Sequence, residues 1–224
     1  TGAIEVKGHS MVGQDVGQLL QGKAVGVVVT YDVNAALQNG DALIEFTSPN
    51  STLEHLRVAA KLKKPMVIGT TGFRSDEEAI IAGFAKEIPI VFSPNMSVGV
   101  NLLFELTRLA TERLGLRYDV AIVEAHHRTK QDNPSGTAKR LQEIISEARS
   151  PSKIVKEPVP CQSIRAGDIV GEHTVIFAGP HEQLEFTHRA SSRDVFAVGA
   201  LRAAQLIVQQ KPGLYDMSSV LAPT

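Results

Sequence analysis

Short apolar runs alternate with amphipathic segments through the first part of the chain. The runs are rich in β-branched and aliphatic residues, which favours buried strands. Four strands are expected from them, at residues 25–30, 41–46, 66–68 and 88–92. Between these runs, apolar residues recur at helical spacing, and Glu78 follows Ser75 by three residues, which predicts a helix that begins with a capping box. This alternation predicts right-handed βαβ units and an α/β fold with a parallel sheet.

Two loops follow predicted strands of this sheet. They comprise Gly69, Thr70 and Thr71 after one strand and Ser93, Pro94, Asn95 and Met96 after the next. Ligands of parallel sheets bind beyond the carboxyl ends of the strands, so both loops are candidate binding segments. Ordinary turns between a strand and a helix have similar compositions, and the residues alone leave both interpretations open.

The sequence opens on what reads as the end of a strand, residues 1–5, with Glu5 at its carboxyl tip. In dinucleotide-binding folds an acidic residue there accepts hydrogen bonds from the adenosine ribose and follows a glycine-rich phosphate loop by one βα unit. No such loop precedes Glu5 in the printed sequence. One interpretation is that a strand, a glycine loop and a helix are missing ahead of Thr1, and the family resemblance described below favours it. The alternative, which the residues alone favour, is that Glu5 is an ordinary surface residue.

A second region combines a strand, a polar loop and the start of a helix. Residues 118–123 read as a buried strand, and apolar residues at helical spacing place a helix start near Ser135. The stretch between them carries two imidazoles, a guanidinium and an ammonium. A helix start offers unpaired backbone N–H groups to carboxylate or phosphate, and Gly136 allows a close approach to the backbone. These features predict a site for a small dianion with acid–base groups beside it.

A metal site is the alternative for this region. His126 and His127 are neighbours in an extended segment, so their side chains point to opposite faces and are poorly placed to bind one ion. No further group of His and Cys has the spacing of metal ligands. We therefore expect no metal at this site.

The composition is that of an ordinary globular protein. A chain of 224 residues can hold one large or two small domains. The net charge of −1 gives no case for a nucleic-acid or membrane partner, and no apolar run approaches membrane-spanning length. The single cysteine, Cys161, excludes an internal disulfide and suits a reducing cytoplasm.

The stretch from Glu124 to Ala138 resembles the signature of the 4-hydroxy-tetrahydrodipicolinate reductase (dihydrodipicolinate reductase) family. The family pattern is Glu-x-His-His-x-x-Lys-x-Asp-x-Pro-Ser-Gly-Thr-Ala, and this sequence has the family residue at every fixed position. Other segments resemble the family as well, at residues 69–73, 95–101, 165–173 and 213–217; the third carries Arg-x-Gly-x-x-x-Gly-x-His. The resemblance covers the sequence from Glu5 to Leu221.

This resemblance implies an enzyme that reduces 4-hydroxy-tetrahydrodipicolinate, via dihydrodipicolinate, to tetrahydrodipicolinate with NADH or NADPH in diaminopimelate and lysine biosynthesis. It implies His126 and Lys130 as acid–base residues, without deciding which delivers the proton. The residues implied to bind substrate are His127, Ser135, Gly136, Thr137 and Arg193. Those implied to bind the cofactor are Glu5, Lys7, Gly69, Thr70, Thr71, Ser93, Pro94, Asn95 and Met96.

The resemblance also implies two domains. A Rossmann-like dinucleotide-binding domain is expected at 1–96, with 194–224 returning to it. An α+β domain with a mixed sheet is expected at 97–193, where it binds substrate and assembles the chain into a homotetramer. Family members usually carry a longer loop near residue 150, so a segment is expected to be missing there.

The choice between the two cofactors depends on the residues after Glu5. Members of the family that favour the 2′-phosphate often have an arginine directly after the acidic residue, and here that position is Val6. Glu5 favours a free ribose hydroxyl, while Lys7 could reach a phosphate. We expect NADH to be accepted at least as well as NADPH.

Two other functions are compatible with the sequence. One is another two-domain reductase of the aspartate pathway, such as a homoserine or semialdehyde dehydrogenase. The other is a non-catalytic sensor of a dinucleotide or dicarboxylate on the same fold, because a fold does not fix a function. The presence of both His126 and Lys130 argues against a sensor, since binding alone requires no proton donor.

Overall fold

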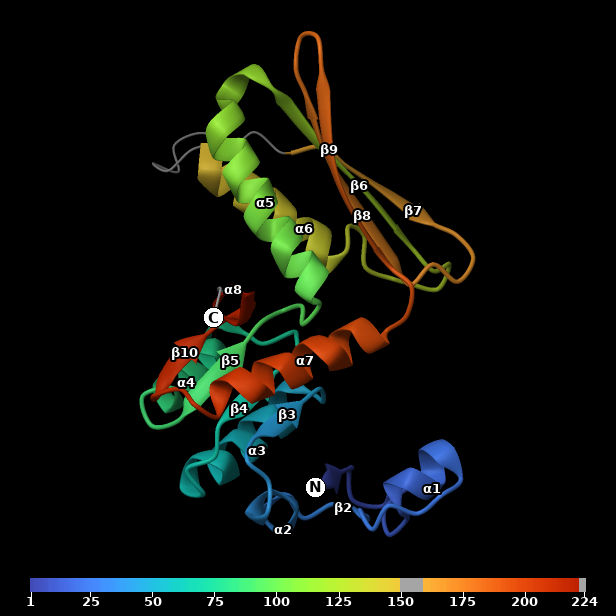
Figure 1. Cartoon of the computed structure of the whole chain (residues 1–224), viewed down its shortest axis with the longest axis vertical. Helices are drawn as coiled ribbons and strands as arrows, with labels where there is room; N and C mark the ends of the chain where they lie inside the picture. The colour runs from blue at the N-terminus through green and yellow to red at the C-terminus, as the bar shows by residue number, and fades with distance from the viewer. Residues whose placement is uncertain (150–158, 222–224) are drawn as a thin grey trace. The chain divides into compact units, whose positions relative to one another are not determined.

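The computed structural model describes residues 1–149 and 159–221 of the chain (Figure 1). The chain divides into two compact units. The first unit comprises Thr1–Ser93 and Ala200–Asp216, and the second comprises Pro94–Gly199 and the chain from Met217 onward. The roles and boundaries expected for the two domains stay predictions. The segment expected to be missing near residue 150 falls outside the described residues.

A parallel four-stranded sheet forms the centre of the first unit. Its order is β10-β5-β4-β3, with β3 (Leu43–Glu45), β4 (Met66–Ile68), β5 (Pro89–Phe92) and β10 (Gly213–Tyr215). Every neighbouring pair in it is parallel, and β4 is entirely buried. Helices α3 (Pro49–Lys61) and α4 (Ser75–Phe84) pack on this sheet through a core that includes Leu56, Ile68 and Ile81. The expected Rossmann-like parallel sheet is thus confirmed.

A smaller parallel pair, β1 (Ala3–Ile4) and β2 (Val29–Thr30), forms a separate two-stranded sheet in the first unit. The strand expected over 25–30 is therefore too long. Residues 25 and 26 are held in a loop because the Asp15 carboxylate accepts their backbone N–H groups, at 2.9 and 2.7 Å, and Gly26 has a positive φ of 78°. Short helices α1 (Val16–Gln21) and α2 (Val33–Gln38) lie in the same part of the chain.

The capping box expected at α4 is displaced by one residue. Arg74, not Ser75, is the last extended residue before the helix. The Glu77 carboxylate accepts the backbone N–H of Arg74 at 2.8 Å and also pairs with its guanidinium at 2.8 Å. Glu78 is exposed. The helix starts one residue earlier than the sequence spacing suggested, so Glu77 occupies the position from which a side chain can fold back.

The second unit contains a mixed sheet in the order β7-β6-β8-β9. Its strands are β6 (Asp119–His126), β7 (Cys161–Arg165), β8 (Gly171–Ala178) and β9 (Gln183–Ala190). β7 is parallel to β6, whereas β8 and β9 are antiparallel to their neighbours. Helices α5 (Val98–Leu114) and α6 (Gly136–Arg149) lie side by side along one face of this sheet (Figure 1). The expected mixed sheet is confirmed.

Two apolar layers hold these helices on the sheet. Leu103 and Leu141 from the helices meet Ile122, Val175 and Phe177 from the strands, and all five side chains are buried. A 3-10 turn (Gly115–Arg117) follows α5, and the short helix α8 (Met217–Leu221) packs on α5. The long helix α7 (Asp194–Ile207) begins in this unit and ends in the first.

The strand before the signature stretch is longer than expected. β6 continues to His126, so Glu124 and His126 belong to the strand and not to the loop. The reason is pairing on both sides: Ala125 pairs with Glu172 on β8, and His126 pairs with Arg165 on β7. The helix start near Ser135 is confirmed, since α6 begins at Gly136.

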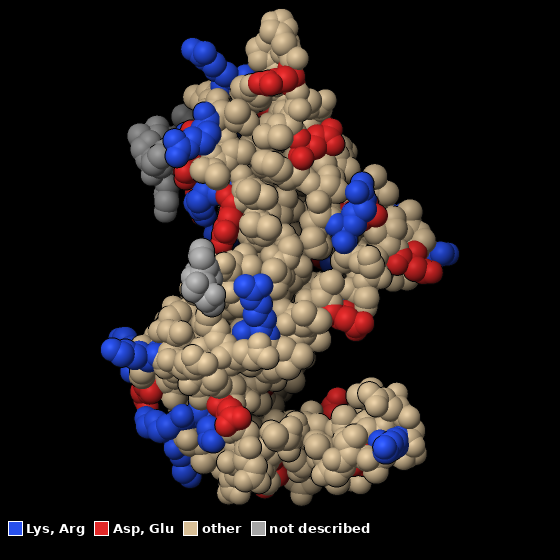
Figure 2. Space-filling model, in the orientation of Figure 1, with Lys and Arg blue, Asp and Glu red and all other residues tan. Residues whose placement is uncertain are grey.

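Lysine and arginine side chains are interspersed with aspartate and glutamate on the face of each unit that Figure 2 shows. This mixture agrees with the net charge of −1. Among the described residues, every helix is either too short or too polar to cross a membrane.

Candidate functional site

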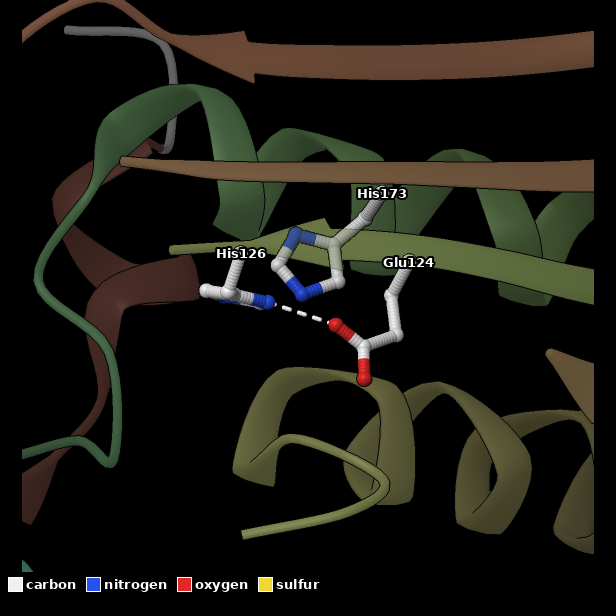
Figure 3. Close-up of side chains that lie close together, drawn as sticks. All are labelled: Glu124, His126 and His173. Atoms are coloured by element: carbon white, nitrogen blue, oxygen red, sulfur yellow. Dashed lines mark hydrogen bonds and ion pairs between the residues drawn. The ribbon is translucent and has the colours of Figure 1, made fainter. Parts of the chain in front are cut away.

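The end of β6 places Glu124 and His126 on one face of the sheet. Alternate residues of a strand share a face, and both side chains are buried, with exposed fractions of 0% for Glu124 and 8% for His126. The imidazole Nδ1 of His126 lies 2.5 Å from Oε2 of Glu124 (Figure 3). The polar start of the signature stretch is therefore an internal carboxylate–imidazole pair.

Arg165, at the end of the neighbouring strand β7, completes this pair. Its Nη1 donates to Oε2 of Glu124 at 2.9 Å and its Nη2 donates to Oε1 at 2.7 Å, a bidentate arrangement. Burial by itself would raise the pKa of the Glu124 carboxyl, but the hydrogen bonds to it, led by those from Arg165, bring that pKa down to about 2. Glu124 is thus an ionised carboxylate inside the unit.

A second buried imidazole lies beside the first. His173 faces Glu124 across the β6–β8 pairing, and its ring meets the ring of His126 edge-on at 5.1 Å between centroids (Figure 3). Its Nε2 lies 3.0 Å from the hydroxyl of Ser135. Burial lowers the pKa of His173 to about 3, so this imidazole is neutral near pH 7. His173 therefore connects the sheet to the start of α6.

The protonation of His126 follows from its surroundings. Burial lowers the pKa of His126; Glu124 opposes this shift, while the charges of Lys130 and Arg165 add to it. A neutral imidazole carries one hydrogen, and the ionised Glu124 can only accept, so the hydrogen lies on Nδ1. Nε2 is then a hydrogen-bond acceptor. A Cβ at Gly171 would lie 3.1 Å from this Nε2, so the absence of a side chain there leaves it room.

Glu124, His126 and His173 also form a group whose potential ligand atoms lie within 4.8 Å of one another. The sequence argument against a metal considered His126 with His127 and the spacing of other His and Cys residues, so it missed this group, whose members lie on two paired strands. The Glu124 carboxylate is already engaged by Arg165 and His126, and Nε2 of His173 contacts Ser135, while Nδ1 of His173 has no hydrogen-bond partner among the described residues. A cation would have to displace the Arg165 guanidinium, so the arrangement fits a hydrogen-bond network better than a metal centre.

The loop after β6 is more open. His127 is half-buried, with its Nδ1 2.8 Å from the hydroxyl of Thr129. Lys130 pairs with Asp132, with Nζ 2.7 Å from Oδ1, and its side chain is 23% exposed. The hydrogen bond from Lys130 lowers the pKa of Asp132. Asp132 is the partner of Lys130 that the sequence did not indicate.

The start of α6 divides its polar groups between internal and accessible positions. Ser135 is 2% exposed; its hydroxyl accepts the N–H of Ala138 at 3.2 Å, and its own N–H points to Oε1 of Glu124 at 3.4 Å. Gly136 is exposed, and a Cβ there would meet no atom within 4 Å. Thr137 is half-buried. The visible contacts of Ser135 are structural, whereas Gly136 and Thr137 remain open to a ligand.

Arg193, the remaining predicted substrate residue, lies just before α7. Its side chain is exposed, and its carbonyl accepts the N–H of Phe196 at 3.1 Å. No hydrogen bond joins it to the network around His126 among the contacts of the described residues. Its role stays a prediction from the family resemblance.

The predicted cofactor residues of the first unit lie at the carboxyl ends of β1, β4 and β5. Glu5 is half-buried, and its carboxylate accepts the N–H of Val6 at 3.0 Å. Lys7 is exposed, with its ammonium 5.5 Å from the ring centre of Tyr31. Ser93 is buried at the end of β5.

The Gly-Thr loop after β4 is partly structural. A Cβ at Gly69 would lie 2.2 Å from the ring of Phe46, so only glycine fits beneath that ring. The buried hydroxyl of Thr70 accepts the N–H of Thr47 at 3.0 Å and the hydroxyl hydrogen of Thr52 at 2.9 Å. Thr71 is exposed. Gly69 and Thr70 thus join the ends of β3 and β4, and Thr71 is the most accessible of the three.

Pro94, Asn95 and Met96 belong to the second unit. The amide of Asn95 donates to the hydroxyl of Thr137 at 3.1 Å, and its Oδ1 accepts the N–H of Ser97 at 2.8 Å. A predicted cofactor residue is therefore bonded to a predicted substrate residue. Pro94 is exposed, while Met96 is buried and its carbonyl lies so close to Gly199 that a Cβ there would be 1.7 Å away.

Comparison with known families agrees with this arrangement. The chain matches the family model described as "Dihydrodipicolinate reductase, N-terminus" over residues 1–96, and that described as "Dihydrodipicolinate reductase, C-terminus" over residues 99–221. The chain belongs to the dihydrodipicolinate reductase family. Members of this family are oxidoreductases.

Relatives named 4-hydroxy-tetrahydrodipicolinate reductase resemble the chain over nearly its whole length. Those from Geotalea uraniireducens and Syntrophus aciditrophicus are 48% and 46% identical, over 99% of this chain and 88% of their own lengths. A solved structure of a dipicolinate-bound dihydrodipicolinate reductase from Paenisporosarcina sp. TG-14 has a TM-score of 0.74 at 23% identity, covering 96% of this chain and 86% of that one. An amine dehydrogenase from Mycobacterium smegmatis has a TM-score of 0.60 at 14% identity, with the same coverage. These two structures support the fold.

Three residues of the network had no role in the sequence prediction: Glu124, Arg165 and His173. Their signal was present, because Glu124 opens the family signature, and Arg165 and His173 are the fixed ends of the Arg-x-Gly-x-x-x-Gly-x-His segment. What the sequence did not supply was the pairing of β6 with β7 and β8, which brings these residues together.

Family membership and the Rossmann-like sheet imply a nicotinamide dinucleotide cofactor. The first unit fits such a group. Glu5 and Glu45 line a cavity of about 520 Å³. Glu45 is buried; its Oε2 lies 2.7 Å from His55, and its Oε1 has no hydrogen-bond partner among the described residues. Carboxylates accept hydrogen bonds, so this cavity suits the hydroxyl groups of a ribose.

Proposed function

We propose that this chain catalyses the reduction of 4-hydroxy-tetrahydrodipicolinate, via dihydrodipicolinate, to tetrahydrodipicolinate with NADH or NADPH, the activity for which its relatives are named. Its place would be diaminopimelate and lysine biosynthesis in the cytoplasm. One observation carries the proposal: the complete family signature folds into a buried, preorganised imidazole beside an accessible lysine and an open helix start.

The helix start is the proposed carboxylate site. Gly136 exposes its backbone, and the N–H groups of the first turn of α6 carry the positive end of the helix dipole. The hydroxyl of Thr137 receives a hydrogen bond from Asn95, so its own hydrogen can be donated to a ligand. His127 lies one residue beyond the strand end and is the proposed further contact to the substrate.

The two acid–base residues would have different roles. His126 is neutral and presents Nε2 as an acceptor, so it is suited to hold and orient the substrate through a hydrogen that the substrate donates. Lys130 carries an ammonium and is the proposed proton donor. The cofactor, when bound, supplies the hydride.

For the cofactor, we propose that NADH is accepted at least as well as NADPH. Glu5 offers a carboxylate to a ribose hydroxyl, and Val6 occupies the position at which an arginine would favour a phosphate. Lys7 is the opposing feature, since its ammonium could reach a 2′-phosphate. Comparison of kcat/KM for the two cofactors tests this proposal, and a strong preference for NADPH would contradict it.

We further propose a homotetramer built on the face of the mixed sheet opposite α5 and α6. By strand alternation this face carries Val123, Ile164 and Ile176, which are half-buried or exposed. Light scattering of the purified protein would give its mass, and replacement of Ile164 by lysine should lower that mass. A monomeric wild-type protein would refute the assembly.

The central test is loss of NADH or NADPH absorbance by the expressed protein, with substrate generated in place from pyruvate and aspartate semialdehyde by the preceding synthase. Rapid loss that collapses when His126 or Lys130 is replaced would support the reductase and both roles. Cofactor binding without turnover would favour a sensor. Oxidation of homoserine, or activity abolished by alkylation of Cys161, would favour a different reductase of the aspartate pathway.

A further inference from the structure

We propose that Glu124, clamped by Arg165, is a positioning residue that fixes the tautomer of His126, so that Nδ1 carries the hydrogen and Nε2 faces the reaction as an acceptor. The consequence for the rate rests on the proposed reductase function. The tautomer itself can be measured without any turnover, so the two proposals can fail separately.

Both oxygens of the Glu124 carboxylate are surrounded by N–H groups. Oε1 accepts from Nη2 of Arg165 at 2.7 Å and from the N–H of Ser135 at 3.4 Å. Oε2 accepts from Nη1 of Arg165 at 2.9 Å and contacts Nδ1 of His126 at 2.5 Å. An ionised carboxylate has no hydrogen to give, so the hydrogen of this last contact belongs to His126.

Both residues of this contact are buried. Glu124 is 0% exposed and His126 is 8% exposed, so water cannot supply a substitute partner for Nδ1. The edge-on ring of His173 packs against the imidazole, and the glycine at position 171 leaves room only on the side of Nε2. The orientation of His126 is therefore set by protein groups alone.

Arg165 influences the charge of both Glu124 and His126. A lone carboxylate beside His126 would favour the imidazolium, whose Nε2 would be a donor. The guanidinium neutralises Glu124, and its charge disfavours a second cation beside it. Arg165 is itself anchored, because Nη2 also donates to the carbonyl of Asp132 at 2.7 Å and Nη1 to that of Ile164 at 2.8 Å. Burial is the main cause of the lowered pKa of His126, and Arg165 adds to this shift while it keeps Glu124 an acceptor.

The Glu124→Gln variant tests the proposal. Its amide must place an NH₂ at one of the two oxygen positions. At the Oε1 position it would meet two donors, from Arg165 and Ser135, that cannot reverse. At the Oε2 position it meets one Arg165 donor and His126, and an imidazole can change its tautomer to accept. We therefore expect His126 in this variant to move its hydrogen to Nε2.

The readout is the ¹H–¹⁵N correlation spectrum of protein labelled with ¹⁵N-histidine, with His126 assigned by its loss in His126→Asn. Wild-type protein should show hydrogen on Nδ1 and Glu124→Gln should show it on Nε2. The kcat of this variant should fall by about 100-fold or more with little change in KM, because a positioned acid–base residue contributes on this scale. Glu172→Gln is the matched control, since Glu172 lies on the neighbouring strand in an exposed pair with Arg189.

A second substitution separates positioning from simple structural damage. Removing the guanidinium with Arg165→Met in the Glu124→Gln background frees the amide to turn its oxygen toward His126. The double variant should regain hydrogen on Nδ1 and recover at least about 10-fold in kcat, although it lacks two native side chains. A role that is only structural predicts that the double variant is worse than the single one.

Three results would overturn the proposal. One is a wild-type spectrum with hydrogen on Nε2, which decides the matter even where Glu124→Gln does not fold. Another is an unchanged tautomer in a folded Glu124→Gln variant. The last is a double variant with no recovery of tautomer or rate. A wild-type protein with hydrogen on Nδ1 but no turnover would refute the reductase and leave the positioning of the imidazole standing.

Discussion

The signature stretch consists of two parts that differ in the burial of their side chains and in their bonding partners. In its strand part, residues 124–126, both polar side chains are buried and bonded to protein partners. In its loop part, residues 127–133, the side chains are half-buried or exposed, and Lys130 has one carboxylate partner at the surface. One sequence motif thus combines an internal scaffold with groups left open to a ligand.

This difference teaches that a residue's place in the motif determines what its loss should damage. Removing a loop residue takes away chemistry and leaves the fold, because its contacts are with solvent and with surface partners. Removing a residue of the strand part leaves its bonding partners unpaired in the interior, where an unpaired charge lowers the stability of the folded protein. Substitutions in the loop part should therefore lower activity, and substitutions in the strand part should also lower stability.

The largest expected effect is on the loop side, at Lys130. Lys130→Gln removes the proposed proton donor, and kcat should fall by about 10²- to 10⁴-fold. The denaturation midpoint should stay within the range of surface substitutions, since Lys130 and Asp132 form a partly exposed pair. Lys63→Gln is the control, because Lys63 also pairs with a carboxylate, Glu87, at the surface. If Lys130→Gln also lost stability, the proposed difference between the two parts would be wrong.

The next effect is on the strand side and concerns stability. Arg165→Met in otherwise wild-type protein leaves the Glu124 carboxylate buried without its counter-charge, and unfolding free energy should drop by about 3–5 kcal/mol. Urea titration followed by circular dichroism measures this. Arg189→Met, which breaks the exposed pair with Glu172, should cost no more than about 1 kcal/mol. Equal losses in the two variants would show that the buried pair is no different from a surface one.

The contrast between the two parts also shows which features of the structure can be predicted from the sequence. The start of helix α6 was predicted to within one residue, because apolar residues recur at helical spacing after Ser135. The parallel sheet followed from β-branched runs separated by helices. These features are local, and short-range patterns report them well.

The end of β6 was missed for a physical reason. Glu124 and His126 are polar at positions where a buried strand normally carries apolar residues, so the pattern read as a loop. Their burial is made possible by Arg165, which is 41 residues away along the chain. No local pattern contains that partner. The predicted capping box shifted for a similar reason, since the choice between Glu77 and Glu78 depends on where the chain turns into the helix.

A third prediction concerns how the buried residues around Glu124 make the stability of the folded protein depend on pH. The pKa of His173 is about 3 in the folded protein against 6.5 for the free side chain. Because the pKa is lower in the folded protein, the unfolded chain binds the proton at a higher pH than the folded protein does. The stability that is present above pH 6.5 is therefore lost as the pH falls toward 3, by up to about 1.4 kcal/mol per pH unit. Glu124, with a folded pKa of about 2 against 4.5, acts in the same direction but only below pH 4.5.

Between pH 6.5 and 5 only His173 of these two residues contributes, because the effect of Glu124 begins below pH 4.5. The stability lost over that interval should therefore be smaller by about 2 kcal/mol in His173→Gln than in the wild-type protein. Some slope should persist, because burial also lowers the pKa values of His126 and His188. Urea midpoints at four or five pH values measure it. His181→Gln, at an exposed site, should leave the wild-type slope. An unchanged slope in His173→Gln would mean that the imidazole is not a neutral part of the scaffold.

The smallest expected effect lies at Asn95, which is bonded to Thr137 at the start of α6. The N–H of Ser97 fixes Oδ1 of Asn95, so Nδ2 must face Thr137, and the hydroxyl hydrogen of Thr137 is left for a ligand. In Asn95→Asp a carboxylate oxygen replaces Nδ2, accepts that hydrogen, and adds a negative charge near the proposed carboxylate site.

The KM for substrate should then rise by about 10-fold with kcat nearly unchanged, consistent with the loss of one hydrogen bond worth about 1 kcal/mol and some charge repulsion. Gln209→Glu, an exposed amide-to-acid exchange, is the control. The family resemblance assigns Asn95 to the cofactor instead, and that assignment predicts a rise in the KM for NADH. The ratio of the two KM changes therefore decides whether this residue extends the scaffold toward the substrate, as its bond to Thr137 implies, or belongs with the cofactor loop.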